Sequence, residues 1–356
     1  MSRKLVAIAL SGGVDSSAAA ALLIESGYEL IGIAMHLWSD GVCVSDDGYR
    51  PCPSRQNASD AEQVCHTLGI PFHAINLETQ FKQYVIDYFC REYARGRTPN
   101  PCIACNQHIK FGFLLDHALS LGADYLATGH YARIRYYNGA YHLLRGIDLE
   151  KDQSYMLYTL GQEKLSRVLF PVGDHIKADI QELARQKGLP TAGKRSSQDI
   201  CFITSDYGSF LNRYLSPAPG EIIDSRGKVL GKHRGTAFYT IGQRHGLELA
   251  TPEPLYVTKI EAGTNRLVVG SKEELLCPGL TATQINWVSG KMPTQPLAVE
   301  VKIRYRSPLV PAIIYPKKES VEVRFREPQP AVTPGQAVVF YHDSEVLGGG
   351  IIESPK

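Results

Sequence analysis

The N-terminal half of the chain alternates between short apolar runs and longer segments with helical periodicity. Unbroken apolar runs are typical of strands buried on both faces of a parallel sheet, and they occur at 5–10, 28–38, 72–77 and 125–128. Segments with helical composition or periodicity lie between or after them, at 18–25, 57–68, 79–95, 109–121 and 177–188. Asn57 is the expected N-cap of the second helix. This alternation predicts a doubly wound parallel α/β sheet.

The pattern changes after about residue 206. Turn signals separate short β-prone runs across 220–275, which predicts a small β-rich domain. Strict alternation of apolar and polar residues begins near Leu280 and predicts an antiparallel barrel, with Gly348 to Gly350 expected as a tight turn before the last strand. We therefore divide the chain into an α/β domain at 1–206, a small β-rich domain at 207–277 and a β-barrel at 278–356.

Composition narrows the class of protein. A chain of 356 residues suits two or three domains, and a net charge of +2 gives no global signal for nucleic acid or membrane, so an RNA partner must be met by local patches. No apolar stretch is long enough to span a bilayer and no convincing signal peptide is present, which predicts a cytoplasmic protein. The eight cysteines then favour catalysis, redox chemistry or metal binding over structural disulfides.

The first strand leads into the turn Ser11-Gly-Gly-Val-Asp-Ser-Ser17 and then into an alanine-rich helix. Free backbone N–H groups and the positive end of the helix dipole at such a turn suit an anion, and two glycines let the backbone approach it closely. Asp15 would repel phosphate unless a metal ion lay between them. The turn matches neither the Walker loop nor G-x-G-x-x-G, but it lies at the sheet edge where open α/β folds bind ligands.

Two cysteines have surroundings that favour nucleophilic chemistry. Cys105 is expected just before the helix at 109–121, and Cys201 follows a basic segment. The neighbouring cationic side chains are Arg95, Arg97 and Lys110 near the first, and Lys194 and Arg195 before the second. Helix N-termini and cations lower thiol pKa values, so we expect both cysteines to form thiolates.

Six motifs together resemble the tRNA-specific 2-thiouridylase family of ATP pyrophosphatases, over essentially the whole chain and in the family's order. They are Ser11–Ser17, Gly96–Asn106 with Ile109–Phe111, Ala127–Arg133, Lys151–Tyr155, Ile200–Phe202 and Tyr239–Gly246. The resemblance implies an ATP pyrophosphatase domain, a small central domain and a tRNA-contacting barrel. It implies ATP- and Mg²⁺-dependent thiolation of the wobble uridine, position 34, in tRNAs for lysine, glutamate and glutamine. The sulfur donor it implies is a cysteine desulfurase or a sulfur-relay carrier protein.

The resemblance also implies roles for individual residues. Cys201 would carry a persulfide and Cys105 would be the nucleophile that completes transfer, leaving a disulfide between them that needs reduction. The implied ATP contacts are Ala9, Leu10, Ser11, Gly12, Gly13, Val14, Asp15, Ser16, Met35 and Gly129, with Asp15 helping to hold Mg²⁺. The implied tRNA contacts are Asn100, Pro101 and Cys102 around the flipped base, then His130, Lys151, Asp152, Gln153, Arg304, Tyr305, Arg306 and Gln336.

One position departs from the family pattern, because Cys102 stands where many members have an acidic residue. Three thiols with one open coordination position also suit a [4Fe–4S] cluster, so a cluster on Cys102, Cys105 and Cys201 is a second hypothesis. Two further functions stay open: an amide-forming ATP pyrophosphatase, which would not need the cysteine pair, and a non-catalytic RNA-binding protein. The sequence assigns no role to Cys43 or Cys52.

Overall fold

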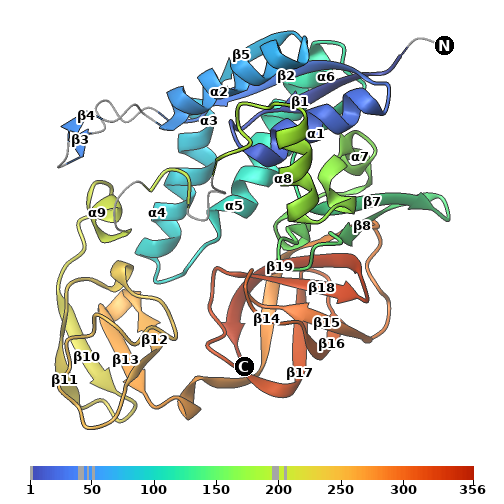
Figure 1. Ribbon diagram of the computed structural model, residues 1–356. Helices are drawn as coiled ribbons and strands as arrows, with labels where there is room; N and C mark the ends of the chain where they lie inside the picture. Colours follow the sequence, from blue (N-terminus) through green and yellow to red (C-terminus); the bar gives the residue numbers. More distant parts are fainter. Residues whose placement is uncertain (1–2, 39–43, 46–47, 50–52, 195–199, 204–206) are drawn as a thin grey trace.

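The computed structural model describes residues 3–38, 44–45, 48–49, 53–194, 200–203 and 207–356. These residues form an α/β domain, a small β domain and a closed antiparallel barrel in chain order (Figure 1). The predicted fold class is therefore confirmed. The expectations on Cys43, Cys52 and Arg195 lie outside the described residues.

Five parallel strands form the central sheet of the α/β domain, in the order β5-β2-β1-β6-β9. They are β1 (Leu5–Ala9), β2 (Glu29–His36), β5 (Phe72–Asn76), β6 (Tyr125–Ala127) and β9 (Val168–Leu169). The chain builds outward from β1 through β2 and β5, then returns to the other side of β1 with β6 and β9. This reversal places a topological switch point at the carboxyl ends of β1 and β6, where such sheets bind ligands.

Both faces of this sheet are covered by helices, which explains the unbroken apolar run of β1. Val6 and Ile8 pack with α1 (Val14–Glu25), α2 (Pro53–Leu68) and α8 (Lys177–Gln186). Ala7 and Ala9 belong to the core on the opposite face, which is formed with the helices of residues 78–120. Those helices are α3 (Glu78–Phe81), η1 (Lys82–Ile86), α4 (Asp87–Ala94), α5 (Pro101–Ala104), η2 (Cys105–Leu114) and α6 (Leu115–Ser120).

Two predicted helix starts were wrong. Helix α2 begins at Pro53, so Asn57 lies inside it and is not an N-cap. The helix expected from 109 begins instead at Pro101, because the Asn100 side chain accepts a hydrogen bond from the Cys102 backbone nitrogen at 3.0 Å. Asn followed by Pro is a strong start signal, since the Asn side chain caps the first turn and proline suits the first helical position.

A hairpin that the sequence analysis did not predict joins the α/β domain to the barrel. Strands β7 (Ala132–Tyr137) and β8 (Ala140–Arg145) pair with each other, and Leu144 pairs with Glu345 of the last barrel strand. The rest of this domain consists of short elements: β3 (Val44–Ser45), β4 (Gly48–Tyr49), η3 (Ser154–Leu157), α7 (Gln162–Leu165) and η4 (Pro171–Asp174).

The small β domain is a four-stranded sheet in the order β11-β10-β13-β12 with its own apolar core. Its strands are β10 (Gly220–Asp224), β11 (Val229–His233), β12 (Tyr256–Glu261) and β13 (Arg266–Gly270). Short helices lie before, within and after this sheet: α9 (Tyr207–Asn212), η5 (Thr236–Phe238), η6 (Ala262–Thr264) and η7 (Glu273–Leu275). It lies below α4 and α9 in Figure 1, and it contacts the barrel where Ile241 packs with Ala331 and accepts a hydrogen bond from Arg304 at 3.3 Å.

The barrel closes because its last strand pairs back with its first. Its strands are β14 (Leu276–Trp287), β15 (Leu297–Lys302), β16 (Val310–Pro316), β17 (Ser320–Pro330), β18 (Ala337–His342) and β19 (Glu345–Pro355). The turn expected at Gly348–Gly350 was wrong, because these glycines lie inside β19. A side-chain carbon on Gly348 or Gly350 would collide with the β14 backbone, so the glycines let the closing strands approach.

In the part of the chain that the structure describes, no helix is both long and apolar enough to cross a membrane.

Candidate functional site: a phosphate-binding loop and a thiol cluster

The turn after β1 forms a compact loop at the switch point. Gly12 has φ of +69°, a conformation that suits glycine, and the Ser11 backbone nitrogen donates to Ser16 Oγ at 3.2 Å. The hydroxyls of Ser16 and Ser17 donate to the Gly13 carbonyl at 3.1 and 2.9 Å. Gly13 caps α1 without a side-chain hydrogen bond, so the first turn of this buried helix presents its N–H groups to a ligand.

The end of β6 packs directly against this loop. A side-chain carbon on Gly129 would lie 2.6 Å from the Ser16 backbone nitrogen and 2.7 Å from the Asp15 carbonyl carbon. Real Cβ atoms do not approach backbone atoms so closely, so only glycine fits. The structure thus brings Gly129 together with the Ser11–Ser17 loop, whereas Met35 lies half-buried at the end of β2.

Asp15 is held from two sides by residues that the sequence analysis did not single out. Its Oδ1 atom accepts hydrogen bonds from the Tyr131 hydroxyl at 2.7 Å and from Lys177 Nζ at 2.6 Å. The other oxygen, Oδ2, has no hydrogen-bond partner within the described ranges. We call the Ser11–Ser17 turn the phosphate loop, because its N–H groups suit that anion. One free carboxylate oxygen beside it fits Mg²⁺, which is usually held by one or two carboxylates together with substrate phosphates.

A second lysine contacts the loop at Gly12. Lys194 Nζ donates to the Gly12 carbonyl at 3.2 Å and forms a close ion pair with Asp60. Asp60 lies on α2, is buried, and also accepts from Gln56 Nε2 at 3.1 Å. Two lysine side chains therefore contact the loop, one at Asp15 and one at Gly12.

Three cysteines of the α/β domain lie near one another, from the buried Cys105 to the exposed Cys201. Cys102 and Cys105 belong to the continuous helix that starts at Pro101, and Cys201 sits on a short turn at 200–203. Phe202 anchors that turn, because its buried ring contacts Phe81 and Phe89 at centroid distances of 5.7 and 5.5 Å. The three thiols lie close enough for each to affect the titration of another.

The expectation that Cys105 and Cys201 are thiolates in this state was wrong. Burial raises the pKa of the Cys105 thiol to about 12, and desolvation raises the pKa of Cys201 to about 11 although its side chain reaches the surface. The helix begins before Cys105, so that thiol lies beyond the first turn and in the core. Lys110 opposes the shift, because its charge lowers the pKa of both thiols.

These pKa values predict that alkylation by iodoacetamide, followed by mass spectrometry, is slow at pH 7. The thiolate is the reactive form, so the rate at Cys105 should rise about tenfold per pH unit over the range below its pKa. Lys110→Gln should slow alkylation of Cys105 and leave Cys277, which lies in the barrel, unchanged. A rate at Cys105 that levels off near pH 7 would contradict the raised pKa.

His130 links the end of β6 to the thiol cluster. Its Nδ1 atom lies 2.7 Å from Thr128 Oγ1, and its Nε2 atom lies 3.4 Å from Lys110 Nζ. Burial and the Lys110 charge lower the pKa of His130 well below its usual value, so the imidazole is neutral. A neutral ring can hydrogen-bond a polar ligand without adding charge.

The cysteines do not fit the predicted iron–sulfur cluster as they lie here. Across the residues with described positions, no three His, Cys, Asp or Glu side chains form a group able to hold a metal ion. Cys102 is half-buried and Cys105 is buried, with both pKa values raised by desolvation. The described side chains thus provide no set of ligands for a cluster.

Several implied tRNA contacts take part in structural hydrogen bonds. Asp152 is buried and accepts from the Gly146 and Ser154 backbone nitrogens, both at 3.1 Å, and from Arg145 at 3.4 Å. Gln153 accepts from the Tyr131 backbone nitrogen at 3.0 Å. Lys151 is half-buried in the loop just before them.

The predicted tRNA contacts of the barrel, Arg304 and Arg306, lie in two different surroundings. Arg304 and Arg306 do not alternate along a strand, because β15 ends at Lys302. The Arg304 guanidinium donates to the Ala331 carbonyl at 2.5 Å and to Thr333 Oγ1 at 2.6 Å, whereas Arg306 is exposed. Burial raises the pKa of Tyr305, and the charges of Asp152 and Cys102 add to the shift, so Tyr305 lies near Cys102.

The barrel also supports the loop before the helix that carries Cys102 and Cys105, which we call the thiol helix. Gln336 Nε2 donates to the Thr98 carbonyl at 2.7 Å, and the Thr98 nitrogen donates to the Pro334 carbonyl at 2.9 Å. Arg97 bridges Glu92 and the barrel residue Glu353 at 2.8 and 2.9 Å. Asn100 and Pro101 follow this loop directly, so the barrel fixes the start of the helix that carries Cys102 and Cys105.

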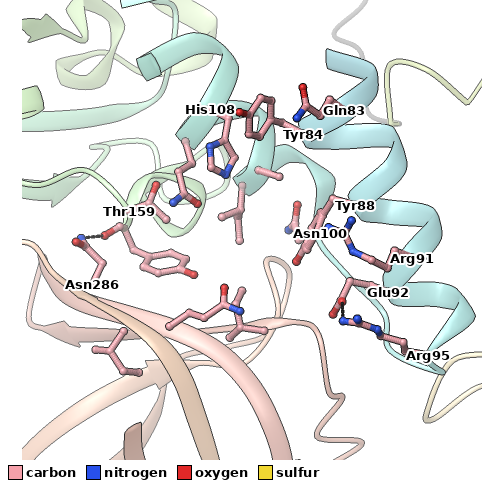
Figure 2. Close-up of a pocket in the computed structure, with 17 residues that line it drawn as sticks. Gln83, Tyr84, Tyr88, Arg91, Glu92, Arg95, Asn100, His108, Thr159 and Asn286 are labelled. Atoms are coloured by element: carbon pink, nitrogen blue, oxygen red, sulfur yellow. Dashed lines mark hydrogen bonds and ion pairs between the residues drawn. The ribbon is translucent and has the colours of Figure 1, made fainter. Parts of the chain in front are cut away.

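A separate cavity of about 670 Å³ lies between α4, the thiol helix and the barrel (Figure 2). Asn100 lines it, with Arg91 on one side and Asn286 on the other. Tyr84 and His108 stack at its upper end, with centroids 4.9 Å apart. No cysteine of the described chain lines this cavity, so it is distinct from the thiol cluster.

A glycine turn and a buried helix N-terminus at the switch point of a parallel sheet define a nucleotide-binding α/β protein. Domain models match along the chain as "tRNA methyl transferase HUP domain" at 4–205, "tRNA methyl transferase PRC-barrel domain" at 208–271 and "Aminomethyltransferase beta-barrel domain" at 278–352. The chain belongs to the tRNA-specific 2-thiouridylase family.

Relatives named tRNA-specific 2-thiouridylase MnmA are similar over nearly their full length. The protein from Geobacter metallireducens is 51% identical over 99% of this chain and 97% of its own. The protein from Carboxydothermus hydrogenoformans is 49% identical, over 99% of this chain and 98% of its own. A solved NMN synthetase from Francisella tularensis has a TM-score of 0.33 and 14% identity, over 55% of this chain and 66% of its own.

Proposed function

We propose that this chain uses ATP to replace the C2 oxygen of uridine 34 in tRNA with sulfur, giving 2-thiouridine, AMP and pyrophosphate. The family supports a tRNA-modifying enzyme. The observation that carries the finer proposal is the thiol cluster of Cys102, Cys105 and Cys201, since the charge of Lys110 lowers the pKa of all three thiols. Lys110 Nζ lies 3.4 Å from His130 Nε2, and His130 directly follows Gly129, which packs against the phosphate loop.

The first half of the reaction activates the C2 oxygen. That oxygen attacks the α-phosphorus of ATP, the bond to the β-phosphate oxygen breaks, and pyrophosphate leaves with the electron pair. The backbone N–H groups at the start of α1 are positioned to stabilise the developing negative charge. Asp15, held by Tyr131 and Lys177, would hold Mg²⁺, which supplies further charge stabilisation when bound.

The second half transfers sulfur. A donor such as a cysteine desulfurase or a sulfur-relay carrier protein leaves a persulfide on Cys201, which is the exposed thiol. The terminal sulfur attacks C2 and AMP departs. Cys105 then attacks the Cys201 sulfur, so that 2-thiouridine is released and a Cys105–Cys201 disulfide forms, which a reductant must reopen.

Uridine 34 must leave the anticodon stack to reach these atoms, because bases inside a stack are inaccessible. Asn100, Pro101 and Cys102 form the start of the thiol helix, and Tyr305 approaches from the barrel. We therefore place the flipped base between this helix start and the barrel. Arg306 is exposed next to Tyr305 and suits a phosphate of the anticodon loop.

The test is mass spectrometry of tRNA incubated with the enzyme, ATP, Mg²⁺ and a persulfide source. We expect 2-thiouridine at position 34 of tRNAs for lysine, glutamate and glutamine, with one AMP formed for each sulfur inserted. An otherwise identical reaction without ATP is the control and should give no product. AMP formation without any thiolated tRNA would instead favour an amide-forming ATP pyrophosphatase.

A further inference from the structure

Lys177 and Lys194 contact the phosphate loop at two different residues, Asp15 and Gly12. Lys177 is the first residue of α8, which packs against α1 (Figure 1), and its side chain is only 11% exposed. Lys194 follows a turn in which its backbone nitrogen donates to the Thr191 carbonyl at 3.0 Å. Both ammonium groups are thus fixed at the loop by the fold, although the residues are distant from the loop in sequence.

Each lysine is held by a carboxylate. Asp15 accepts from Lys177, and Asp60 accepts from Lys194, whose Nζ atom also contacts the Gly12 carbonyl. Asp60 is too distant in sequence to belong to the loop motif. Its side chain is nevertheless buried and is linked to the loop through Lys194. A buried carboxylate needs a partner, and here that partner is the Lys194 ammonium group, which also contacts the loop.

The charge balance at the loop depends on the two lysines. Without the lysines, two carboxylates would lie beside the N-terminus of α1 and would repel a triphosphate. An ammonium group has three N–H donors; Lys177 uses one on Asp15, and Lys194 uses two, on the Gly12 carbonyl and Asp60. Within the described residues the remaining donors have no acceptor, so they are available to an anion in the loop.

We propose, on the basis of the function proposed above, that Lys177 and Lys194 bind the β- and γ-phosphates of ATP and stay on the pyrophosphate as it leaves. As the bond between the α-phosphorus and the bridging oxygen breaks, that oxygen keeps the electron pair. The two ammonium groups offset the added charge on pyrophosphate. Asp15 and Asp60 are positioning residues, because they hold the lysines at the loop when no nucleotide is bound.

Isothermal titration of Lys177→Gln and Lys194→Gln with three probes tests this assignment. The probes are ATP with Mg²⁺, inorganic pyrophosphate with Mg²⁺, and AMP. Each variant should bind ATP and pyrophosphate about 10- to 100-fold more weakly, the range for one lost charge-assisted hydrogen bond, and should bind AMP as the wild type does. Lys177→Arg should recover part of the pyrophosphate affinity.

Lys187→Gln is the matched control, because Lys187 pairs with Glu25 of α1 at 2.5 Å from the far end of α8. It should change none of the three affinities. The assignment would be overturned if Lys177→Gln and Lys194→Gln both bound pyrophosphate as the wild type does. It would also be overturned if their affinity for AMP fell as much as their affinity for pyrophosphate. A wild-type enzyme that binds neither ATP nor pyrophosphate would instead overturn the proposed function.

Discussion

Replacing Cys105 or Cys201 by serine should reduce 2-thiouridine formation about a thousandfold or more, the scale of losing a covalent nucleophile. A serine hydroxyl can neither carry a persulfide nor close a disulfide. Serine is nearly isosteric with cysteine, so both variants should still bind ATP and tRNA. Product is measured by mass spectrometry of digested tRNA, and binding by titration with each substrate.

The two cysteine variants should differ in one readout. Cys105→Ser should retain the added sulfur on Cys201 after treatment with a persulfide donor, whereas Cys201→Ser should retain none there. Cys277→Ser is the control, because this half-buried barrel thiol donates to the Leu275 carbonyl at 3.6 Å and a hydroxyl can replace it. Wild-type thiolation by both active-site variants would remove the basis for the proposed mechanism.

Gly129→Ala should weaken ATP binding about 5- to 150-fold, because overpacking of this size costs about 1–3 kcal/mol. The added methyl group would lie 2.6 Å from the Ser16 backbone nitrogen. That nitrogen belongs to the first turn of α1, whose buried alanines leave the helix no room to retreat. Titration with ATP measures the loss, and circular dichroism shows whether the fold is retained.

Gly161→Ala is the matched control for this substitution. Gly161 precedes α7 with φ of −96°, and nothing lies within 4 Å of the position its side chain would take. We expect wild-type ATP affinity. If Gly129→Ala also bound ATP normally in a folded protein, the loop would not depend on its contact with the end of β6.

The parallel sheet could be predicted from sequence because each strand is buried on both faces and reads as an unbroken apolar run. The loop at Ser11–Ser17 could be predicted because glycines and hydroxyls follow such a strand directly. Lys177 and Lys194 could not, because only tertiary packing brings them to the loop. An isolated lysine at the start of a helix or in a turn is usually a solvated surface charge.

For the thiol cluster, sequence analysis found the cysteines but could not predict their electrostatics. The cysteines and Lys110 were visible in the sequence, but Arg97 pairs with Glu92 and Glu353 and Lys194 pairs with Asp60, so the expected cationic surroundings were only partly right. The direction of the pKa shifts was not visible either. Burial of Cys105 depends on the helix starting at Pro101 and on the aromatic rings packed behind it. Desolvation then outweighs the charge of Lys110, and a linear sequence gives no measure of that balance.

The pairing of β8 with β19 has a consequence for synthesis of the chain. Leu144 and Glu345 become neighbours only when almost the whole polypeptide is available. Until then the β7–β8 hairpin carries an unpaired edge, and Tyr136 at its tip is 64% exposed even in the finished fold. Contacts between such distant residues form late, so the α/β domain emerging from the ribosome must wait for the barrel to complete it.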